Sequence, residues 1–116
     1  MYGSYYGDGN KVNSHFTNLG YLPKVVIVIG DAEGGTGAAN PRKAETVTFI
    51  NTGNFACIEA LDDVGTTRYA DTDGVRDSRL ELVTTASGFT IQNPSTSFNT
   101  IWANKNGVRY TYVIYK

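Results

Sequence analysis

The sequence predicts an all-β domain, an antiparallel β-sandwich with a jelly-roll-like or flattened-barrel arrangement of about eight to ten short strands. Short runs of β-branched and aromatic residues recur along the 116 residues, and turn-forming Gly, Asn and Asp separate them. No segment sustains the 3.6-residue apolar period of an amphipathic helix. A chain of this length favours a single domain that spans residues 1–116.

The densest strand-forming run closes the chain. Residues 108–115 read Val-Arg-Tyr-Thr-Tyr-Val-Ile-Tyr, and Asn106-Gly107 directly before them is a strong signal for a type I′ hairpin turn. Residues 98–102, which include the only Trp, are the predicted partner strand. We therefore expect a closing hairpin that forms a central element of the sheet.

The chain opens with a predicted strand at residues 2–6 and a turn at residues 7–10. Residues 11–18 are predicted as the strand that pairs with the first one. In this second strand the alternation of side chains turns Val12 and Phe16 inward.

An uninterrupted apolar run follows at residues 25–29, between Pro23 and Gly30. A strand with only one buried face should alternate between apolar and polar residues, so this run predicts a strand covered on both faces. The core would cover one face, and a loop or another subunit would cover the other. The Gly-rich residues 30–42 then form a loop long enough to be typical of a functional or mobile segment.

Five more strands are predicted before the closing hairpin, and turn residues bound each of them. In the segment at residues 77–84, Leu80 and Leu82 point inward. The segment at residues 55–61 also suits a short helix, because Ala, Glu and Leu favour helices, but its alternation favours a strand. These five strands are residues 45–51, 55–61, 66–70, 77–84 and 88–91.

Charge and cysteine content exclude several classes of protein. The formal net charge is −1, so no basic field attracts nucleic acid or an anionic membrane. The single cysteine, Cys57, cannot form an intramolecular disulfide, and its apolar neighbours predict a small buried side chain. The first residues lack the pattern of a signal peptide, and the longest apolar run is too short to cross a bilayer. We expect no nucleic-acid partner and no membrane insertion.

Few residues are available for catalysis. A nucleophile and base pair would have to use His15, the only histidine, and no local signature such as G-x-S-x-G accompanies it. We interpret His15 as a surface or edge-strand residue. The sequence therefore predicts no catalytic residue, no cofactor and no enzymatic activity.

One acidic segment resembles part of a calcium-binding loop. Asp71, Asp73 and Gly74 match three positions of such a loop, but Tyr69 and Leu80 occupy its first and twelfth ligand positions. A solvated turn is the alternative, because Asp and Gly are common in turns. We predict no metal site.

Aromatic residues are the other resource of the sequence, with eight Tyr residues. A tyrosine ring combines an apolar face with a polar tip, which suits subunit interfaces and sugar stacking. Core packing is the alternative for those in the closing strand. The candidate subunit-interface residues are Tyr2, Tyr5, Tyr6, Tyr110 and Tyr112.

Residues 2–9, 18–28, 87–91 and 104–114 form four blocks. Their order resembles that of small β-domains at the ends of tail, fibre and minor structural proteins of bacteriophages and prophages. Those domains often read G-x-Y-x-G-(D/N)-G, L-G-F-x-P-K-x-V-x-V, G-F-x-V and N-x-x-G-x-x-Y-x-Y-x-A. This chain departs from the pattern at Tyr21, where Phe is usual, and at Ile114, near a position that is often small. Residues 30–77 are not covered by the resemblance.

The resemblance implies a non-enzymatic virion protein that is made in the host cytoplasm and exposed on the particle, at a tail or fibre tip or as capsid decoration. It further implies a homo-oligomer, with a trimer favoured, which contacts other virion proteins and takes part in assembly, host attachment or both. A carbohydrate-binding module that acts as a receptor-binding tip, with a host cell-surface glycan as its partner, is the alternative. A small hydrolase that uses His15 is a third and weaker hypothesis.

For the carbohydrate-binding alternative, the contacts would lie in two loops, residues 31–42 and 62–77, where polar side chains and Gly occur beside a tyrosine. The candidate ligand or host contact residues in and beside these loops are Asp31, Asn40, Arg42, Arg68, Tyr69, Asp71 and Asp73.

Overall fold

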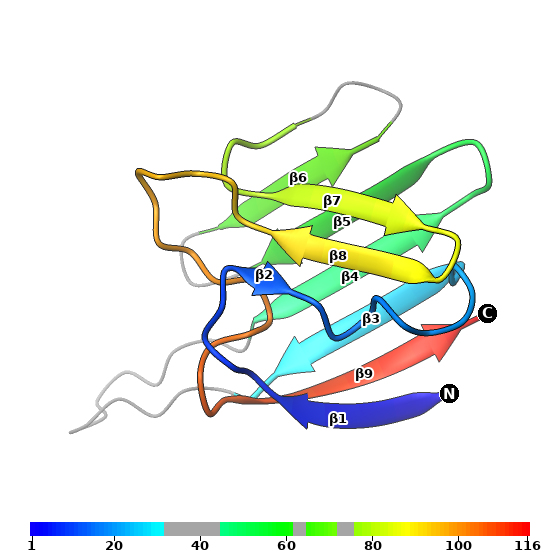
Figure 1. Ribbon diagram of the computed structural model, residues 1–116, viewed down its shortest axis with the longest axis horizontal. Helices are drawn as coiled ribbons and strands as arrows, with labels where there is room; N and C mark the ends of the chain where they lie inside the picture. The colour runs from blue at the N-terminus through cyan, green and yellow to red at the C-terminus, as the bar shows by residue number, and fades with distance from the viewer. Residues whose placement is uncertain (32–44, 62–64, 72–75) are drawn as a thin grey trace.

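A computed structural model describes residues 1–31, 45–61, 65–71 and 76–116. These residues form nine strands in two antiparallel sheets and no helix, which confirms the predicted all-β sandwich (Figure 1). The larger sheet has the order β1-β9-β3-β4-β5-β6, and the smaller has the order β2-β8-β7. The strands are β1 (Tyr2–Tyr6), β2 (Val12–Asn13), β3 (Val25–Gly30), β4 (Thr46–Asn51), β5 (Ala56–Leu61), β6 (Thr66–Ala70), β7 (Glu81–Thr85), β8 (Gly88–Gln92) and β9 (Arg109–Tyr115).

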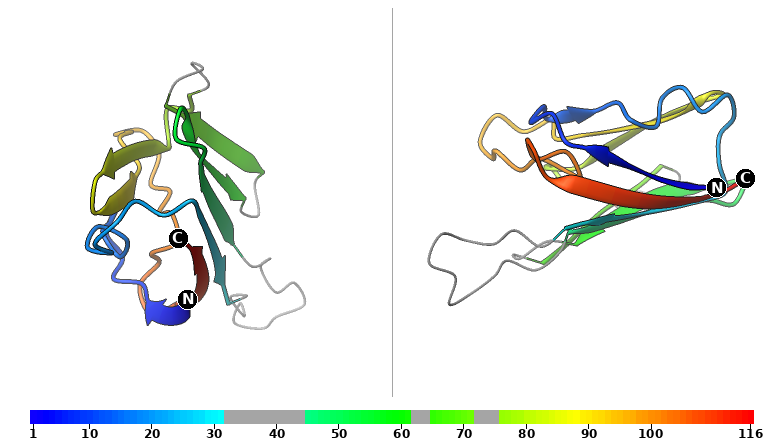
Figure 2. Two further views of the ribbon diagram at one scale, coloured as in Figure 1. Left: turned by 90° about the vertical axis from the view of Figure 1, so that its right-hand side faces the viewer. Right: turned by 90° about the horizontal axis from the view of Figure 1, so that it is seen from below.

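The smaller sheet covers one face of the larger one, and the core lies between them (Figure 2). Alternate residues of each strand point into this space because successive side chains of a strand face opposite ways. Phe49 of β4 stacks on Phe89 of β8 with ring centroids 4.2 Å apart, so this pair joins the two layers directly. Phe16 extends the stack from the other side of Phe89 at 5.2 Å.

Several predicted strands are confirmed with small differences at their ends. The strands at residues 2–6 and 66–70 have the predicted bounds, and β4, β5 and β8 differ from prediction by one residue. The segment at residues 55–61 is a strand and not a helix. Leu80 and Leu82 are buried as predicted, although β7 begins only at Glu81.

The predicted closing hairpin is wrong. β9 pairs with β1 and β3, and residues 98–102 form no strand. Gly107 has a φ of 77°, but Asn106 lacks the positive φ that a type I′ turn also requires. Trp102 instead inserts into the core, where it is 1% exposed and donates its indole N–H to Arg79 O at 2.7 Å. The prediction that the last strand is central is confirmed, because β9 has a neighbour on each side.

The predicted pairing of residues 11–18 with residues 2–6 is also wrong. Only Val12 and Asn13 are in a strand, and they pair with β8 in the smaller sheet. Phe16 is buried as predicted, but Val12 is 45% exposed. The chain therefore crosses from one layer to the other directly after β1.

The apolar strand β3 is covered on one face by the rest of the described chain. Val26 and Val28 are buried in the core, whereas Ile29 on the opposite face is 49% exposed. Cys57, predicted to be buried, is half-buried on the same outer side of the larger sheet. A loop or another subunit was predicted to cover this second face, and the second of these alternatives is taken up below.

Candidate functional site

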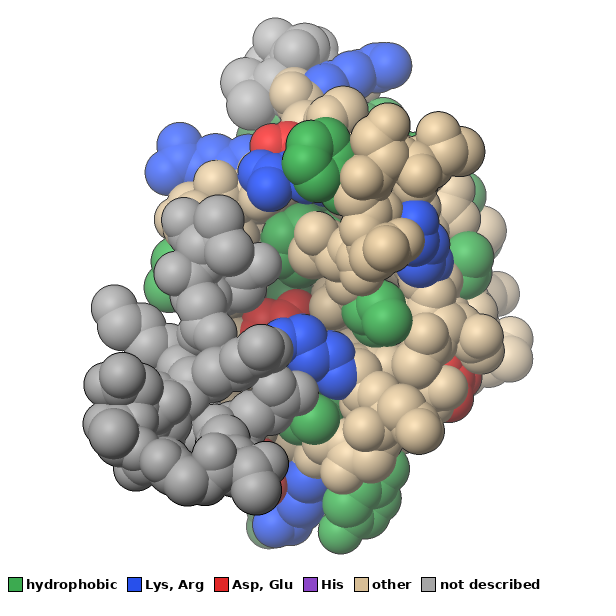
Figure 3. All heavy atoms as spheres, turned by 90° about the vertical axis from the view of Figure 1, so that its left-hand side faces the viewer, with side chains coloured by type: hydrophobic (Ala, Val, Ile, Leu, Met, Phe, Trp, Pro, Cys, Tyr) green, Lys and Arg blue, Asp and Glu red, His purple; other side chains and the backbone are tan. Residues whose placement is uncertain are grey.

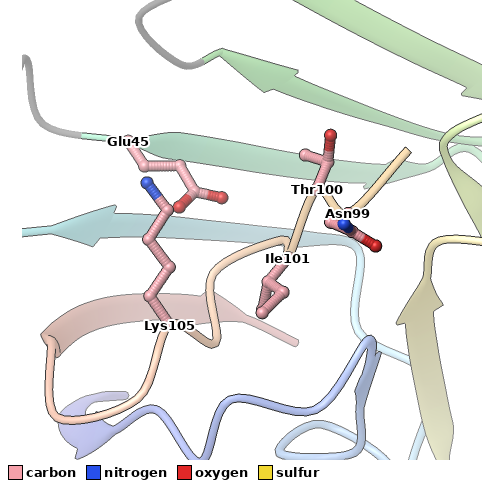
Figure 4. A pocket seen from close by; sticks show the side chains of 5 residues that line it. All are labelled: Glu45, Asn99, Thr100, Ile101 and Lys105. Carbon is pink, nitrogen blue, oxygen red and sulfur yellow. The ribbon is translucent and has the colours of Figure 1, made fainter. Parts of the chain in front are cut away.

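A hollow of about 360 Å³ opens at the end of the sandwich where the segment between β8 and β9 passes the start of β4. Figure 4 shows the five residues that line it, with the Lys105 ammonium directed toward the Glu45 carboxylate. Figure 3 views this end of the molecule and shows acidic and basic side chains beside apolar ones. The lining residues are Glu45, Asn99, Thr100, Ile101 and Lys105.

Glu45 is a buried carboxylate whose position is fixed by the backbone around it. It immediately precedes β4, and its carbonyl oxygen accepts the Gly30 N–H at 2.8 Å, which extends the β3–β4 pairing. The side chain is turned inward, and Oε1 accepts the Ala103 N–H at 2.6 Å. The residue is only 7% exposed, so this charge-assisted hydrogen bond holds the carboxylate in one orientation.

Ala103, the partner of Glu45, has a strained backbone. Its φ of 49° is the only positive value of a non-glycine residue among the described residues, and an L-residue adopts it at a cost of roughly 1–2 kcal/mol. Its carbonyl oxygen accepts the Tyr5 hydroxyl at 2.8 Å and Asn13 Nδ2 at 3.2 Å. Burial raises the pKa of Tyr5 well above its ordinary value, so the phenol keeps its proton and remains a donor.

The wall of the hollow at residues 99–101 is held by side chains from other parts of the chain. Asn93 Nδ2 donates to Phe98 O at 3.2 Å and to Thr100 O at 2.9 Å. The Lys11 ammonium donates to Ser95 O and Phe98 O, both at 2.8 Å. These contacts satisfy carbonyl groups of an irregular segment that has no sheet partner.

Behind the hollow, the fully buried Asn104 uses both ends of its amide. Its Nδ2 donates to Asp8 Oδ1 at 2.5 Å and to Asn10 O at 3.1 Å. Its Oδ1 accepts the Asp8 N–H at 3.1 Å and lies 3.0 Å from His15 Nε2. Because an amide oxygen cannot donate, His15 must carry a proton on Nε2. The His15 ring stacks on Tyr5 with centroids 3.9 Å apart, so the histidine is a structural contact of this network.

A second feature is the outer face of the larger sheet, opposite the smaller sheet (Figure 2). The register brings together apolar side chains from neighbouring strands; for example, Val113 of β9 lies opposite Ile27 of β3. The group, called here the outer apolar face, consists of Tyr2, Val25, Ile27, Ile29, Ile50, Cys57, Leu61, Val113 and Tyr115. Six of these side chains are more than one third exposed, namely Tyr2, Ile29, Ile50, Leu61, Val113 and Tyr115.

Comparison of the chain with protein-family models, curated proteins and solved structures found no match. Function therefore has to be inferred from the residues and their geometry.

The predicted contact loops are partly described. Asn40, Arg42 and Asp73 lie outside the described residues. Asp31, Arg68, Tyr69 and Asp71 are described, and none of them lines the hollow at Glu45. Arg68 and Tyr69 line a smaller hollow of about 210 Å³ beside β5 and β6, where Arg68 pairs with Glu59 at 2.7 Å.

The five predicted interface tyrosines divide into two groups. Tyr110 is 1% exposed in the core of its own chain, and Tyr5 and Tyr112 pack against that core. Tyr5 stacks on Tyr110 at 5.3 Å. Tyr2 and Tyr6 are 82% and 67% exposed on the outer side of β1. Only this second pair is accessible to another molecule to any large extent.

The acidic residues of the described chain do not gather into a metal site. No group of three or more His, Cys, Asp or Glu side chains suited to hold a metal ion occurs there. Asp77, which follows the calcium-type segment in the sequence, accepts hydrogen bonds from Arg79 N at 2.9 Å and Nε at 3.3 Å. No helix that could span a membrane occurs in the described part of the chain either.

Sequence reasoning missed all five residues of the hollow at Glu45. Glu45 reads as the first residue of an alternating strand, and its contact with Ala103 joins positions 58 residues apart. Asn99, Thr100 and Ile101 read as part of a strand. No local pattern marks this site, because the long-range packing of Trp102 and Ala103 creates it.

Proposed function

We propose that this chain is a non-enzymatic structural protein of a bacteriophage particle, in which copies of the chain associate through the outer apolar face. The observation that carries the association is the exposure of apolar side chains across neighbouring strands of one sheet face. Contiguous apolar surface of this kind marks interaction sites in soluble proteins. A second copy of this chain is the partner proposed here.

The size of the face suits such an association. The five strands that carry the face, about 4.8 Å apart and each about five residues long at roughly 3.4 Å per residue, cover on the order of 400 Å² in projection. Side chains roughen the face, so its accessible area is larger than its projection. Stable interfaces bury roughly 800 Å² per partner, so the projection of the face alone supplies about half of that area.

The distribution of charge also suits an interface. The neighbouring strands β9 and β3 place Val113 opposite Ile27, with Ile29 further along β3, so these three side chains form a contiguous apolar part of the face. The charged side chains lie away from this part, because Glu59 of β5 pairs with Arg68 on the edge strand β6 and Arg109 stands at one end of β9. An apolar centre with a polar rim is the usual anatomy of a protein interface.

The assignment to a phage particle is supported by the four blocks that resemble phage β-domains. In the fold these blocks contact each other in pairs. Residues 2–9 pair with residues 104–114 through β1 and β9, and Gly7 donates its N–H to Val108 O at 2.9 Å. Leu19 of the second block donates its N–H to Ser87 O of the third at 2.9 Å. The matching residues therefore form connected structural units, as expected for a pattern that specifies a fold.

Association is tested by size-exclusion chromatography with light scattering on the purified chain at about 10 µM. At this concentration, complexes with a dissociation constant near 1 µM are mostly formed. We expect a mass that is a multiple of the 12.6 kDa chain. Val113→Lys places a charge at the centre of the face and should give a monomer, because an unpaired charge cannot be buried cheaply.

Val83→Lys is the matched control, since Val83 is a strand residue of similar exposure, 42% against 37%, on the smaller sheet. It should keep the mass of the unchanged chain. A monomeric wild-type chain, or a Val113→Lys variant that associates as before, would contradict the proposed interface.

The particle assignment is tested separately with antibodies against the purified chain, which should label assembled phage particles from the producing strain. Purified particles that lack the chain would contradict it.

A further inference from the structure

We propose that the hollow at Glu45 binds a neutral polyhydroxylated ligand, such as a single sugar ring. This inference goes beyond the proposed structural role. It does not depend on association of copies, because none of the five residues of the hollow belongs to the outer apolar face.

The lining residues offer the hydrogen-bonding groups that such a ligand needs. Glu45 contributes acceptors and Lys105 donors, and the Asn99 amide and Thr100 hydroxyl supply both. Sugar hydroxyls both donate and accept, so they can satisfy this mixture. Ile101 adds an apolar surface for the C–H groups of a ring.

The charges in the hollow favour a neutral ligand over an ion. The Glu45 carboxylate and the Lys105 ammonium have opposite formal charges and point toward one another (Figure 4). Their fields oppose each other within the hollow, so neither an anion nor a cation gains a net attraction. Hydrogen-bond geometry is then the main source of selectivity.

The site is also held in place before any ligand arrives. The 2.6 Å hydrogen bond from Ala103 N fixes the Glu45 carboxylate. Ala103 keeps its strained φ of 49° because Tyr5 and Asn13 hold its carbonyl. Backbone strain of this kind concentrates at ligand sites, and a fixed polar group loses little entropy when it binds.

Two polar groups of the wall remain available for a ligand. Among the described residues, neither the Asn99 nor the Thr100 side chain makes a hydrogen bond, although Asn93 anchors the Thr100 carbonyl at 2.9 Å. The volume of about 360 Å³ lies near the lower end of the roughly 300–1,000 Å³ typical of ligand pockets. A single ring suits this space better than an oligosaccharide.

The test is an NMR titration of the ¹⁵N-labelled chain with three neutral sugars, methyl α-D-glucopyranoside, methyl α-D-galactopyranoside and N-acetylglucosamine. Each sugar is added up to about 50 mM, which covers weak dissociation constants in the millimolar range. We expect at least one of these sugars to give saturable shifts of the backbone amides of residues 99–105. Asn99→Ala and Lys105→Met should each weaken binding about fivefold, the effect of one net hydrogen bond.

Asn54→Ala, which removes an exposed amide in the turn between β4 and β5, is the matched control and should leave the affinity unchanged. Absence of saturable shifts with all three sugars would overturn the proposal, as would unchanged binding by both hollow variants. Tighter binding of glucuronate or glucosamine than of the neutral sugars would contradict the neutral ligand class. Repeating the titration with Val113→Lys separates this result from association, because that variant keeps the hollow and should bind equally well.

Discussion

At the scale of single residues, Asn104 and Ala103 join parts of the chain that are far apart in sequence. Asn104 satisfies groups of Asp8, Asn10 and His15, some 90 residues away. Ala103 contacts Glu45 through its N–H and Tyr5 and Asn13 through its carbonyl. Both residues are almost fully buried, so each hydrogen bond replaces water that cannot reach these atoms. One short irregular segment thereby connects both sheets.

Asp8 makes the stability of this network dependent on pH. The Asn10 backbone N–H, 2.9 Å from Oδ1, and then the Asn104 side-chain amide lower the pKa of Asp8 below its ordinary value. A carboxyl group whose pKa is lower in the folded chain stabilises the fold above the unfolded pKa of about 3.9 and loses this contribution as the pH falls through the folded pKa. The free energy of unfolding should therefore decrease below about pH 4.

Asp8→Asn keeps an oxygen acceptor but removes the titration, so its free energy of unfolding should fall less steeply than that of the wild type below about pH 4. Urea unfolding at a series of pH values measures this difference. Asp77→Asn should likewise flatten the profile below about pH 4. Burial alone would raise the pKa of Asp77, but hydrogen bonds from Arg79 outweigh it and lower that pKa. Parallel profiles for Asp8→Asn and the wild type would show that Asp8 contributes no linkage.

At the scale of elements, the sequence specifies which segments become strands better than which strands pair. Alternation and turn residues identify β1, β4, β5, β6 and β8 almost to the residue, because these signals are local. Pairing depends on long-range contacts, and Asn106-Gly107 misleads because Trp102 and Ala103 pack into the core instead of forming a strand. β9 then lies between the first and third strands, where its inward Tyr110 and Ile114 complete the core.

The candidate site was less predictable than the strands for the same reason. The sequence marks loops rich in polar residues, and parts of these loops lie outside the described residues. The hollow at Glu45 arises from a contact between the start of β4 and the approach to β9. Glu45, Asn99 and Lys105 have no spacing that links them in sequence. The apolar run of β3, which lacks alternation, predicts a strand covered on both faces, whereas the described residues cover only one of them.

The end of β1 lies close to the segment that precedes β9, and this gives a prediction about Gly7. A Cβ at this position would lie 2.1 Å from Lys105 O and 2.5 Å from the Asn104 carbonyl carbon, both backbone atoms. Gly7→Ala should therefore force the two segments apart and lower the free energy of unfolding by about 3 kcal/mol. Urea unfolding followed by tryptophan fluorescence measures this loss, because Trp102 lies in the adjoining segment.

Gly53→Ala provides the control for Gly7→Ala. Gly53 has a φ of 91° and nothing within 4 Å of an added Cβ, so its substitution reports backbone strain alone, about 1 kcal/mol. We expect Gly7→Ala to be the more damaging change by a clear margin. Equal losses of unfolding free energy for the two variants would mean that the end of β1 and the segment before β9 can move apart without cost.

At the scale of the whole molecule, the two sides of the larger sheet have different roles. The inner side is covered by the smaller sheet and holds the core, whereas the outer side exposes apolar residues of β1, β3, β4, β5 and β9. The hollow lies at the end of the sandwich, away from both faces. A copy bound to the outer apolar face would therefore leave the hollow accessible, so the proposed association and ligand binding are compatible.

The apolar character of the outer face predicts how association responds to solution conditions. Screening by salt weakens interfaces built on charge pairs, but here the centre of the face is uncharged and Arg68 is already paired with Glu59 within one chain. Raising sodium chloride from about 0.05 M to about 0.5 M should leave the dissociation constant unchanged or lower it. Sodium sulfate should lower it further because sulfate favours burial of apolar surface.

Warming from about 5 °C to about 25 °C should also strengthen association, since apolar burial is driven by entropy in this range. Sedimentation equilibrium measures the constant under each condition. Dissociation by salt would instead identify a charged surface as the interface and exclude the outer apolar face.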